Sequence, residues 1–252
     1  MGGMEAGTMK TLKNKRHMHL IRRDCAIKMR LVPYGSGWTD VYIDFGDGEE
    51  YFVISNVMGA GFEALMRALY YLHPFHNNDE EAGDIIDYKD GVCDYINGKF
   101  IVTKVVDDIH EAGIEVPYTY RRIPWKAHFT WDEEGCEYHW SLEKEANEDE
   151  SFMIKLRIES NRDGLKAFDF QFPYEDLCYA VADASTKALK RHGFFGYHSS
   201  TYTEDINLRY LLFLKAVALR NMEACQVTRY PEKGKGDTSS FTKEMELLLF
   251  DM

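Results

Sequence analysis

The chain has 252 residues, of which 45% are hydrophobic and 14% aromatic, and its formal net charge is −12. This length suits one domain or two small ones with a well-buried core, and the aromatic content excludes an intrinsically disordered acidic protein. No uninterrupted apolar stretch of the sequence reaches the roughly 18 residues that a helix needs to cross a bilayer. We therefore expect a folded domain and no membrane partner.

The negative charge is concentrated in the middle of the chain. Residues 76–176 hold 11 Lys and Arg against 25 Asp and Glu, whereas the segments on either side are each close to neutral. A negative surface repels phosphate backbones, so nucleic acid is not expected as a partner. Two interpretations of the acidic region stay open: a solvated surface that keeps the protein soluble, or a surface that docks a basic protein.

The second interpretation places the binding surface in the most acidic stretch, 79–115, which holds eleven acids and three bases. Opposed electrostatic potentials speed and orient the association of two proteins. The candidate binding residues are Asp79, Glu80, Glu81, Asp84, Asp87, Asp90, Asp107, Asp108 and Glu111.

The order of the predicted elements indicates an α+β fold, with antiparallel sheets and with helices packed on one face. In a first unit, 25–74, apolar and polar residues alternate with the two-residue period of half-buried strands. The turn Gly46-Asp47-Gly48 is a hairpin signal, and Pro74 closes a helix whose apolar residues recur at helical spacing. The predicted strands are 25–32, 41–45 and 50–56, and the predicted helix is 62–72.

A second unit, 127–193, has the same order of strands followed by a helix. Pro173 opens this helix, and Gly193 is typical of the residue that follows a helix end. Between two of the strands, the run 143–150 is predicted to be a charged turn. The predicted strands are 128–131, 137–142, 152–158 and 167–172.

The segment between the two units, 75–126, is predicted to be an acidic insertion on the sheet. Its valine and isoleucine residues need burial, which a linker would not provide. Asn97-Gly98 is a hairpin signal within it, and the prolines at its end predict a loop at 117–124.

These elements predict a single α+β domain over 25–224, preceded by a basic flexible arm at 1–24 and followed by a loop and C-terminal helix at 225–252. The predicted helices 204–224 and 241–250 are strongly apolar. Such helices are either central in the fold or part of an interface. One hypothesis is therefore a homo-oligomer that forms through these two helices.

Five widely spaced cysteines without a C-x-x-C pair indicate neither a disulfide framework nor a zinc knuckle. The basic start of the chain has no apolar core of a signal peptide, so a cytoplasmic protein is expected. The sequence has no phosphate-binding glycine loop and no G-x-S-x-G elbow, so it predicts no cofactor and no catalytic residue.

Two parts of the sequence could serve either as a chemical site or as ordinary structure: a pair of histidines and one cysteine. His73 and His76, followed by acids, have metal-like spacing, but His73 ends a helix, where a structural role is favoured. Cys178 near a helix start is more typical of a buried small hydrophobe than of a reactive thiolate. No metal is therefore expected.

The aromatic hairpin 131–140 provides the alternative hypothesis, an enzyme of unrecognised type. Glu137, His139 and Ser141 share the polar face of this hairpin, and Glu137 with His139 is a pair suited to acid–base chemistry. The competing interpretation is the exposed polar face of a half-buried hairpin, which is usual for antiparallel sheets.

The same hairpin, with its acidic turn and the motif Gly135-Cys136-Glu137-Tyr138-His139-Trp140, resembles a family of uncharacterised bacterial proteins. The resemblance covers 41–72 and 128–193, and the acidic insertion departs from it. It implies an intracellular α+β protein and assigns no activity. The acidic, motif-poor character is also similar to that of toxin-neutralising immunity proteins, which favours a non-enzymatic inhibitor.

Overall fold

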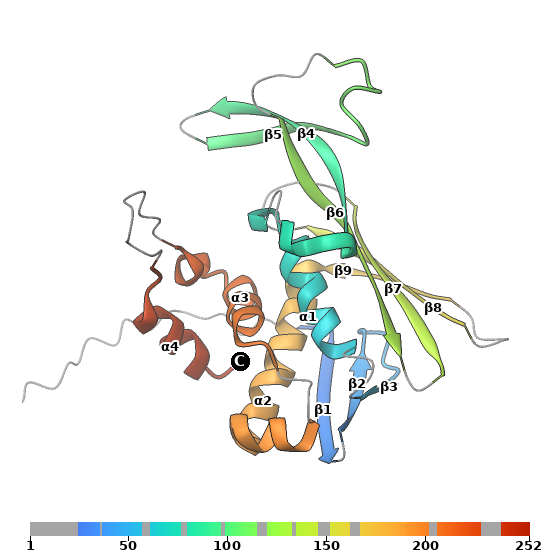
Figure 1. Cartoon of the computed structure of the whole chain (residues 1–252), viewed down its shortest axis with the longest axis vertical. Helices are drawn as coiled ribbons and strands as arrows, with labels where there is room; N and C mark the ends of the chain where they lie inside the picture. Colours follow the sequence, from blue (N-terminus) through green and yellow to red (C-terminus); the bar gives the residue numbers. More distant parts are fainter. Residues whose placement is uncertain are drawn as a thin grey trace, which may run out of the picture.

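We describe the protein from a computed structural model. The described residues are 25–35, 37–56, 61–76, 80–96, 99–114, 120–132, 135–145, 152–161, 167–201, 206–227 and 238–252. The predicted N-terminal arm, and Asp79 among the candidate binding residues, lie outside these ranges. Within them the chain forms four α-helices and two antiparallel sheets, which confirms the predicted α+β fold (Figure 1).

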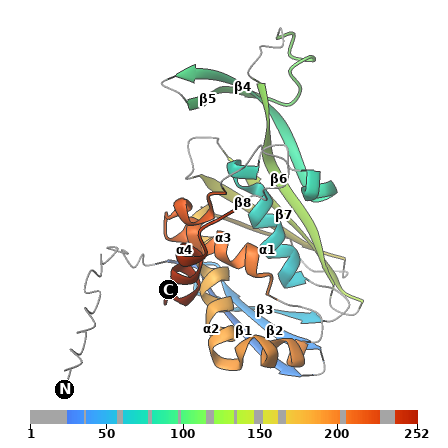
Figure 2. The same cartoon turned by 60° about the vertical axis from the view of Figure 1, so that its left-hand side comes forward.

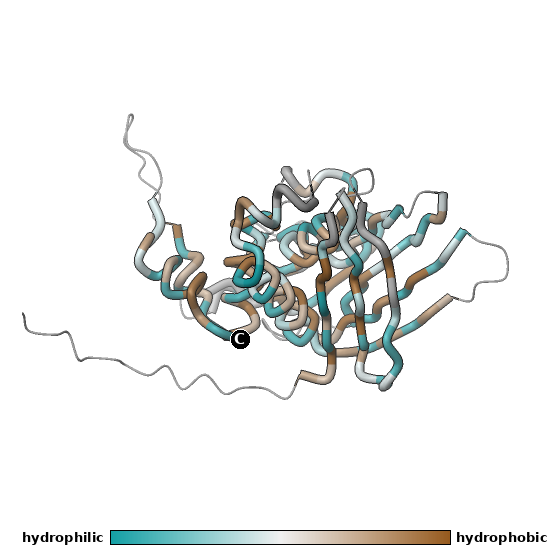
Figure 3. Tube along the Cα trace, turned by 90° about the horizontal axis from the view of Figure 1, so that it is seen from below, coloured by the Kyte–Doolittle hydropathy of each residue, from teal (hydrophilic) through white to brown (hydrophobic). Residues whose placement is uncertain are grey.

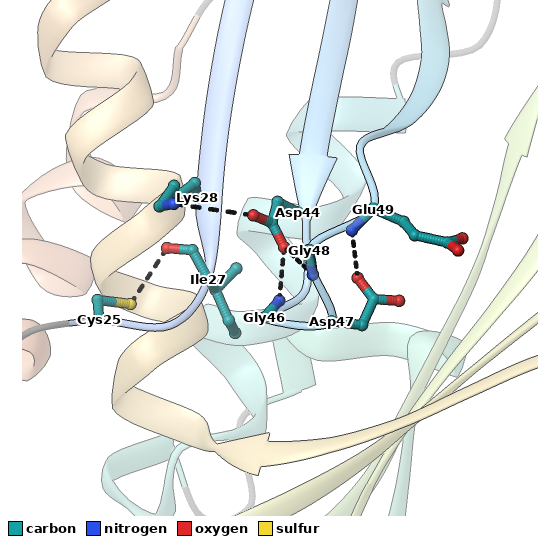
Figure 4. A network of polar contacts seen from close by, with 8 residues as sticks. All are labelled: Cys25, Ile27, Lys28, Asp44, Gly46, Asp47, Gly48 and Glu49. Atoms are coloured by element: carbon teal, nitrogen blue, oxygen red, sulfur yellow. Dashed lines mark hydrogen bonds and ion pairs between the residues drawn. The ribbon is translucent and has the colours of Figure 1, made fainter.

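The first sheet is a three-stranded antiparallel meander in the order β1-β2-β3. Its strands are β1 (Lys28–Gly35), β2 (Trp38–Asp44) and β3 (Tyr51–Asn56). In the turn from β2 to β3, one carboxylate oxygen of Asp44 accepts hydrogen bonds from the backbone N–H of Gly46 at 2.8 Å and of Gly48 at 3.3 Å (Figure 4). Both glycines have positive φ, 94° and 83°, so the D-G signal correctly predicted this hairpin.

The second sheet has six antiparallel strands in the order β5-β4-β6-β7-β8-β9. Its strands are β4 (Ile86–Ile96), β5 (Lys99–Val106), β6 (Tyr120–Asp132), β7 (Glu137–Lys144), β8 (Met153–Ser160) and β9 (Phe168–Pro173). Strands β4 and β5 come from the acidic middle of the chain, and they extend the sheet beyond β6 at one edge.

The helices gather on one side of the six-stranded sheet, as the view from below shows (Figure 3). Helix α1 packs on β6, α2 packs on β1, and α3 contacts both of these helices. The helices are α1 (Gly61–Leu72), α2 (Tyr174–Thr201), α3 (Leu208–Ala218) and α4 (Phe241–Leu249), joined by the short 3₁₀ helices η1 (Pro74–His76), η2 (Glu80–Ile85) and η3 (Met222–Cys225). In the described part of the chain, none of these helices is long and apolar enough to cross a membrane.

The core lies between the two sheets and the helices. Phe45, just after β2, stacks on Phe170 of β9 with ring centroids 4.2 Å apart, and so joins the two sheets. Trp131 and Trp140 pack side by side in the core, with centroids 5.3 Å apart and at most 1% exposure. Along β8, buried apolar side chains alternate with exposed polar ones, as the strand pattern predicted.

Several predicted boundaries were wrong, three of them for a clear physical reason. Residues 120–124 of the predicted loop belong to β6, because Pro124 lies beside an irregularity in the pairing with β4, where a missing N–H is tolerated. Helix α3 ends at Ala218 and is shorter than the predicted helix 204–224, since the backbone turns at Arg220 with φ 52°. The predicted charged turn 143–150 begins too early, because Lys144 still belongs to β7.

Helix α4 is attached to α3 through a buried lysine. The Lys215 ammonium donates hydrogen bonds to the backbone carbonyls of Leu248 at 3.1 Å and Phe250 at 2.8 Å, at the C-terminal end of α4. Carbonyls at that end have no partner within the helix, so a cation there is favourable. Most of α3 is buried, which leaves little of it free for the homo-oligomer hypothesis.

Candidate functional site

The acidic middle of the chain forms a protruding structure, which we call the acidic lobe: β4, β5, the turn 107–114 and the first residues of β6, 120–124. Figures 1 and 2 show it at the top of the molecule, beyond the helices. Strand β5 pairs along its whole length with Asp90–Ile96 of β4, and β4 also pairs with β6 from Ile86 to Val92. The lobe is therefore continuous with the sheet at its base.

Three residues of the lobe are buried apart from the main core. Cys93, Ile109 and Ile123 are each at most 2% exposed, yet they do not belong to the main hydrophobic cluster of the protein. Gly91 lies against the side chains of Ile123 and Val102, and a Cβ atom added at Gly91 would come well within 3.0 Å of Ile123. An alanine at this position would therefore force the Ile123 side chain to shift.

We expect Gly91→Ala to destabilise the lobe selectively, by about 1 to 3 kcal/mol, because overpacking displaces the Ile123 side chain. Amide hydrogen exchange resolved by residue will show faster exchange in β4 and β5 than in α1 and α2. The double variant Gly91→Ala/Ile123→Val removes the clashing Cδ1 atom and is expected to restore most of the protection. Equal losses in lobe and body would contradict this explanation.

Some of the predicted binding acids are presented to solvent. Asp84 on η2, Asp87 on β4 and Glu111 in the turn are exposed. Asp107 is also exposed, and its carboxylate lies 2.9 Å from the Lys89 ammonium. Asp87 lies 3.7 Å from Nδ1 of His128, and such exposed ion pairs are weak.

Two other predicted acids serve the structure of the turn. Asp90 accepts a hydrogen bond from the backbone N–H of Ile109 at 3.0 Å and so ties the turn to β4. Asp108 accepts hydrogen bonds from the backbone N–H groups of His110 at 2.7 Å and Glu111 at 3.1 Å, and these bonds lower the pKa of Asp108. Their carboxylates therefore help to hold the turn of the lobe in place.

The structure adds one acid that the sequence prediction had left out. Asp94 on β4 is exposed on the lobe. The only sign of this exposure in the sequence is its position in the strand, next to the apolar Cys93. The side chains of Glu80 and Glu81 lie outside the described part, although their backbones form the start of η2. Among the described side chains, the exposed acids of the lobe are Asp87, Asp94, Asp107 and Glu111, and Asp84 lies just before the lobe on η2.

The alternative site on the β6–β7 hairpin is an open depression of about 250 Å³ on the outer face of the sheet. His128 and His139 line it together with Arg157, whereas Glu137 does not. Nε2 of His139 is 4.0 Å from the carboxylate of Glu137, and both side chains are about half exposed, 54% and 48%. Such exposure is usual for the polar face of an antiparallel sheet.

The arginine that lines this depression, Arg157, already has two acidic partners. Arg157 donates a hydrogen bond to Glu159 at 2.7 Å and lies 3.4 Å from Asp169, and these partners raise the pKa of Arg157. The depression is therefore an open part of the sheet face, lined by Phe129 and Trp140 as well as polar groups, in which Arg157 is paired with acids. Its geometry gives the enzyme hypothesis less support than the exposed acids give the binding hypothesis.

The histidines and the cysteine weighed above sit in structural surroundings. His73 is 3% exposed, its Nδ1 accepts a hydrogen bond from the backbone N–H of Phe75 at 3.1 Å, and burial lowers its pKa to about 3. The His76 ring packs on Tyr70 with centroids 3.9 Å apart. Among the described residues, no group of three or more His, Cys, Asp or Glu is placed to hold a metal ion. Cys178 is fully buried, and burial raises the pKa of its thiol.

The most unusual titratable group was missed by the sequence analysis. Lys144, at the end of β7, is 1% exposed, and its Nζ lies 4.6 Å from the centre of the Phe152 ring. Within the described part of the chain, this ammonium has no hydrogen-bond partner. Burial lowers the pKa of Lys144 to about 7. A lysine in a run of charged residues looks exposed in the sequence, so no signal pointed to its burial.

Comparison with known proteins adds no relative to this description. No family model matches the chain, and neither a curated protein nor a solved structure shows significant similarity to it. The functional argument therefore rests on the geometry of the acidic lobe and the open sheet face.

Proposed function

We propose that the chain is a non-enzymatic protein-binding module that docks a basic protein partner through the acidic lobe. The observation that supports this proposal is the separate construction of the lobe. Two engaged carboxylates, Asp90 and Asp108, hold the turn of the lobe in place, and the lobe presents its exposed acids, beside the exposed cations Lys104 and Arg122, away from the helices. Carboxylates fixed on one side of a protein attract and orient a basic partner.

The immunity-type inhibitor is the specific form of binding module that we favour. An inhibitor of a basic enzyme must cover the positive surface on which that enzyme binds its substrate. A projecting acidic lobe matches this requirement, because opposed potentials steer the encounter and fix its orientation. Expression in the cytoplasm remains part of this proposal.

Site-specific cross-linking tests the location of the surface. A photo-reactive residue at Lys104, exposed on β5, is expected to capture the partner in cells, whereas the same residue at Lys155, exposed on β8, is not. Both lysines lie on strands of the same sheet, so the pair controls for general accessibility. Equal capture from the two positions would reject the lobe as the binding surface.

Charge reversal then tests the electrostatic contribution with the purified partner. The variant Asp87→Lys/Asp94→Lys/Glu111→Lys is expected to weaken binding by about tenfold or more, with the largest loss at low salt. The control is Glu49→Lys/Glu50→Lys/Glu246→Lys, which changes the net charge equally at exposed positions outside the lobe. Equal effects of the two variants would show that only net charge matters.

A further inference from the structure

A lysine and a histidine are buried together at one corner of the core. Lys144 ends β7, is 1% exposed, and has its Nζ 4.6 Å from the centre of the Phe152 ring. His73 follows α1 and is 3% exposed, and a charge on Lys144 lowers the pKa of His73, so the two groups lie near each other. The His73 ring also faces Tyr174, with centroids 5.8 Å apart. We call this site the lysine corner: His73, Lys144, Glu145, Phe152 and Tyr174.

Two carboxylates that adjoin these residues in the chain have other partners. Glu145, next to Lys144, is exposed and accepts a hydrogen bond from the Gln171 amide. Glu175, next in the chain after the corner and at the start of α2, is buried, and its carboxylate lies 3.6 Å from the Arg220 guanidinium. Burial lowers the pKa of Lys144 to about 7, and among the described groups no carboxylate offsets this effect.

The other titratable groups of this region do not compensate a charge on Lys144. Nδ1 of His73 accepts the hydrogen bond from the backbone N–H of Phe75, so this nitrogen carries no proton. His76 has the same sign of charge when it is protonated, and it lowers the pKa of His73 further. The hydroxyl of Tyr174 donates to a backbone carbonyl of α1 at 2.6 Å, and burial raises its pKa. A protonated Lys144 therefore gains little in the closed core to replace its hydration.

Two backbone hydrogen bonds close the lysine corner. The N–H of Glu145 donates to the carbonyl of Met153 at 3.1 Å, where β7 and β8 begin to separate, and the N–H of Tyr174 donates to the carbonyl of Phe152 at 2.9 Å. The Phe152 ring stacks on the Tyr174 ring with centroids 4.5 Å apart, so Phe152 contacts both the Lys144 amine and α2. Because Lys144 is the last residue of its strand, breaking these few contacts is enough to bring its amine to water.

We propose that the lysine corner is an acid-sensitive joint: protonation of the Lys144 amine opens the end of the β7–β8 pair and separates Phe152 from α2, while the rest of the sheet stays closed. The closed joint holds a neutral amine at pH values above 7, whereas the open joint holds a hydrated ammonium. Opening therefore takes up a proton, and a fall in pH favours the open joint. This device does not depend on the proposed function, because it involves no partner of the lobe.

Amide hydrogen exchange of the full chain, followed by NMR at single residues, tests this proposal. From pH 8 to pH 6, after correction for the intrinsic exchange rate, the protection of the Glu145 and Tyr174 amides is expected to fall about tenfold. This magnitude follows from a pKa of Lys144 of about 7 in the closed joint and 10.5 in water. The Asn161 amide is the internal control, because it donates to the carbonyl of Glu137 at 3.0 Å at the opposite end of the same strand pair. Its protection should stay constant.

Lys144→Met separates the titration of this lysine from other effects of acid. In this variant the protection of the Glu145 and Tyr174 amides should no longer change between pH 8 and pH 6, whereas Lys155→Met, exposed on β8, should keep the tenfold fall of the wild type. A fall that persists in Lys144→Met would overturn the proposal. In the wild type alone, constant protection of Glu145 and Tyr174 would also overturn it, as would an equal fall at Asn161, which would mean that the whole sheet opens.

Discussion

Gly61→Ala is expected to lower the free energy of unfolding by about 2 to 3 kcal/mol, near the upper end of the range for overpacked cores. Gly61 begins α1 and faces Trp131, and a Cβ atom added there would lie well within 3.0 Å of three ring carbons. Trp131 is fully buried against Trp140, so its indole can move only if the surrounding core moves with it. Urea denaturation followed by tryptophan fluorescence measures this change.

Gly196→Ala serves as the control for this prediction. Gly196 also lies in a helical segment, but a Cβ atom there would meet only the Cβ of His192, at 3.9 Å. Alanine in that position restricts the unfolded chain without a clash, so stability should be unchanged or slightly higher. A similar loss in both variants would show that a general effect of replacing glycine, and not the contact with Trp131, is responsible.

Lys144→Met is expected to raise the free energy of unfolding by about 2 to 4 kcal/mol at pH 7, because it removes an unpaired amine from an apolar site. The pKa of Lys144 is about 7 in the folded protein, against 10.5 as its ordinary value. Between these two pH values the unfolded chain binds more protons than the folded one. Wild-type stability, measured against the variant, therefore rises from pH 7 towards pH 10.

Urea denaturation of both proteins at a series of pH values tests this difference. The advantage of Lys144→Met should be largest at pH 7 and below, and it should shrink steadily as the pH approaches 10. Lys155→Met is the matched control, because Lys155 is exposed on the adjacent strand β8 and should show a difference that does not depend on pH. A constant advantage of Lys144→Met across the pH range would contradict this explanation, because it would mean that folding does not lower the pKa of Lys144.

The sequence predicted those elements whose signals are local. The turn Gly46-Asp47-Gly48 and the helix stop at Pro74 are set by backbone preferences of the residues themselves, so both predictions were correct. The start of β6 was missed because Pro124 is normally a strand breaker, and only the pairing irregularity opposite it explains its tolerance. That irregularity depends on β4, which is far away in the sequence.

For the candidate site, the sequence predicted the acidic stretch but not the role of each carboxylate within it. The acidic stretch was evident from composition, but a carboxylate that caps a turn and one that faces solvent have the same residue type. Asp90 and Asp108 differ from Asp87 and Asp94 through hydrogen bonds to backbone groups of the turn. The position of Lys144 inside the fold likewise depends on packing against Phe152, which no local pattern encodes.

The separate core of the acidic lobe has a consequence for how binding is detected. Cys93, Ile109 and Ile123 lie outside the main cluster, so the end of the lobe that they support is expected to open at a lower free energy than global unfolding. On heating, the lobe should melt before the body, so a bound partner would be released before the main transition. A thermal-shift screen that follows the buried tryptophans would then register almost no change, whereas amide exchange in β4 and β5 would report the complex directly.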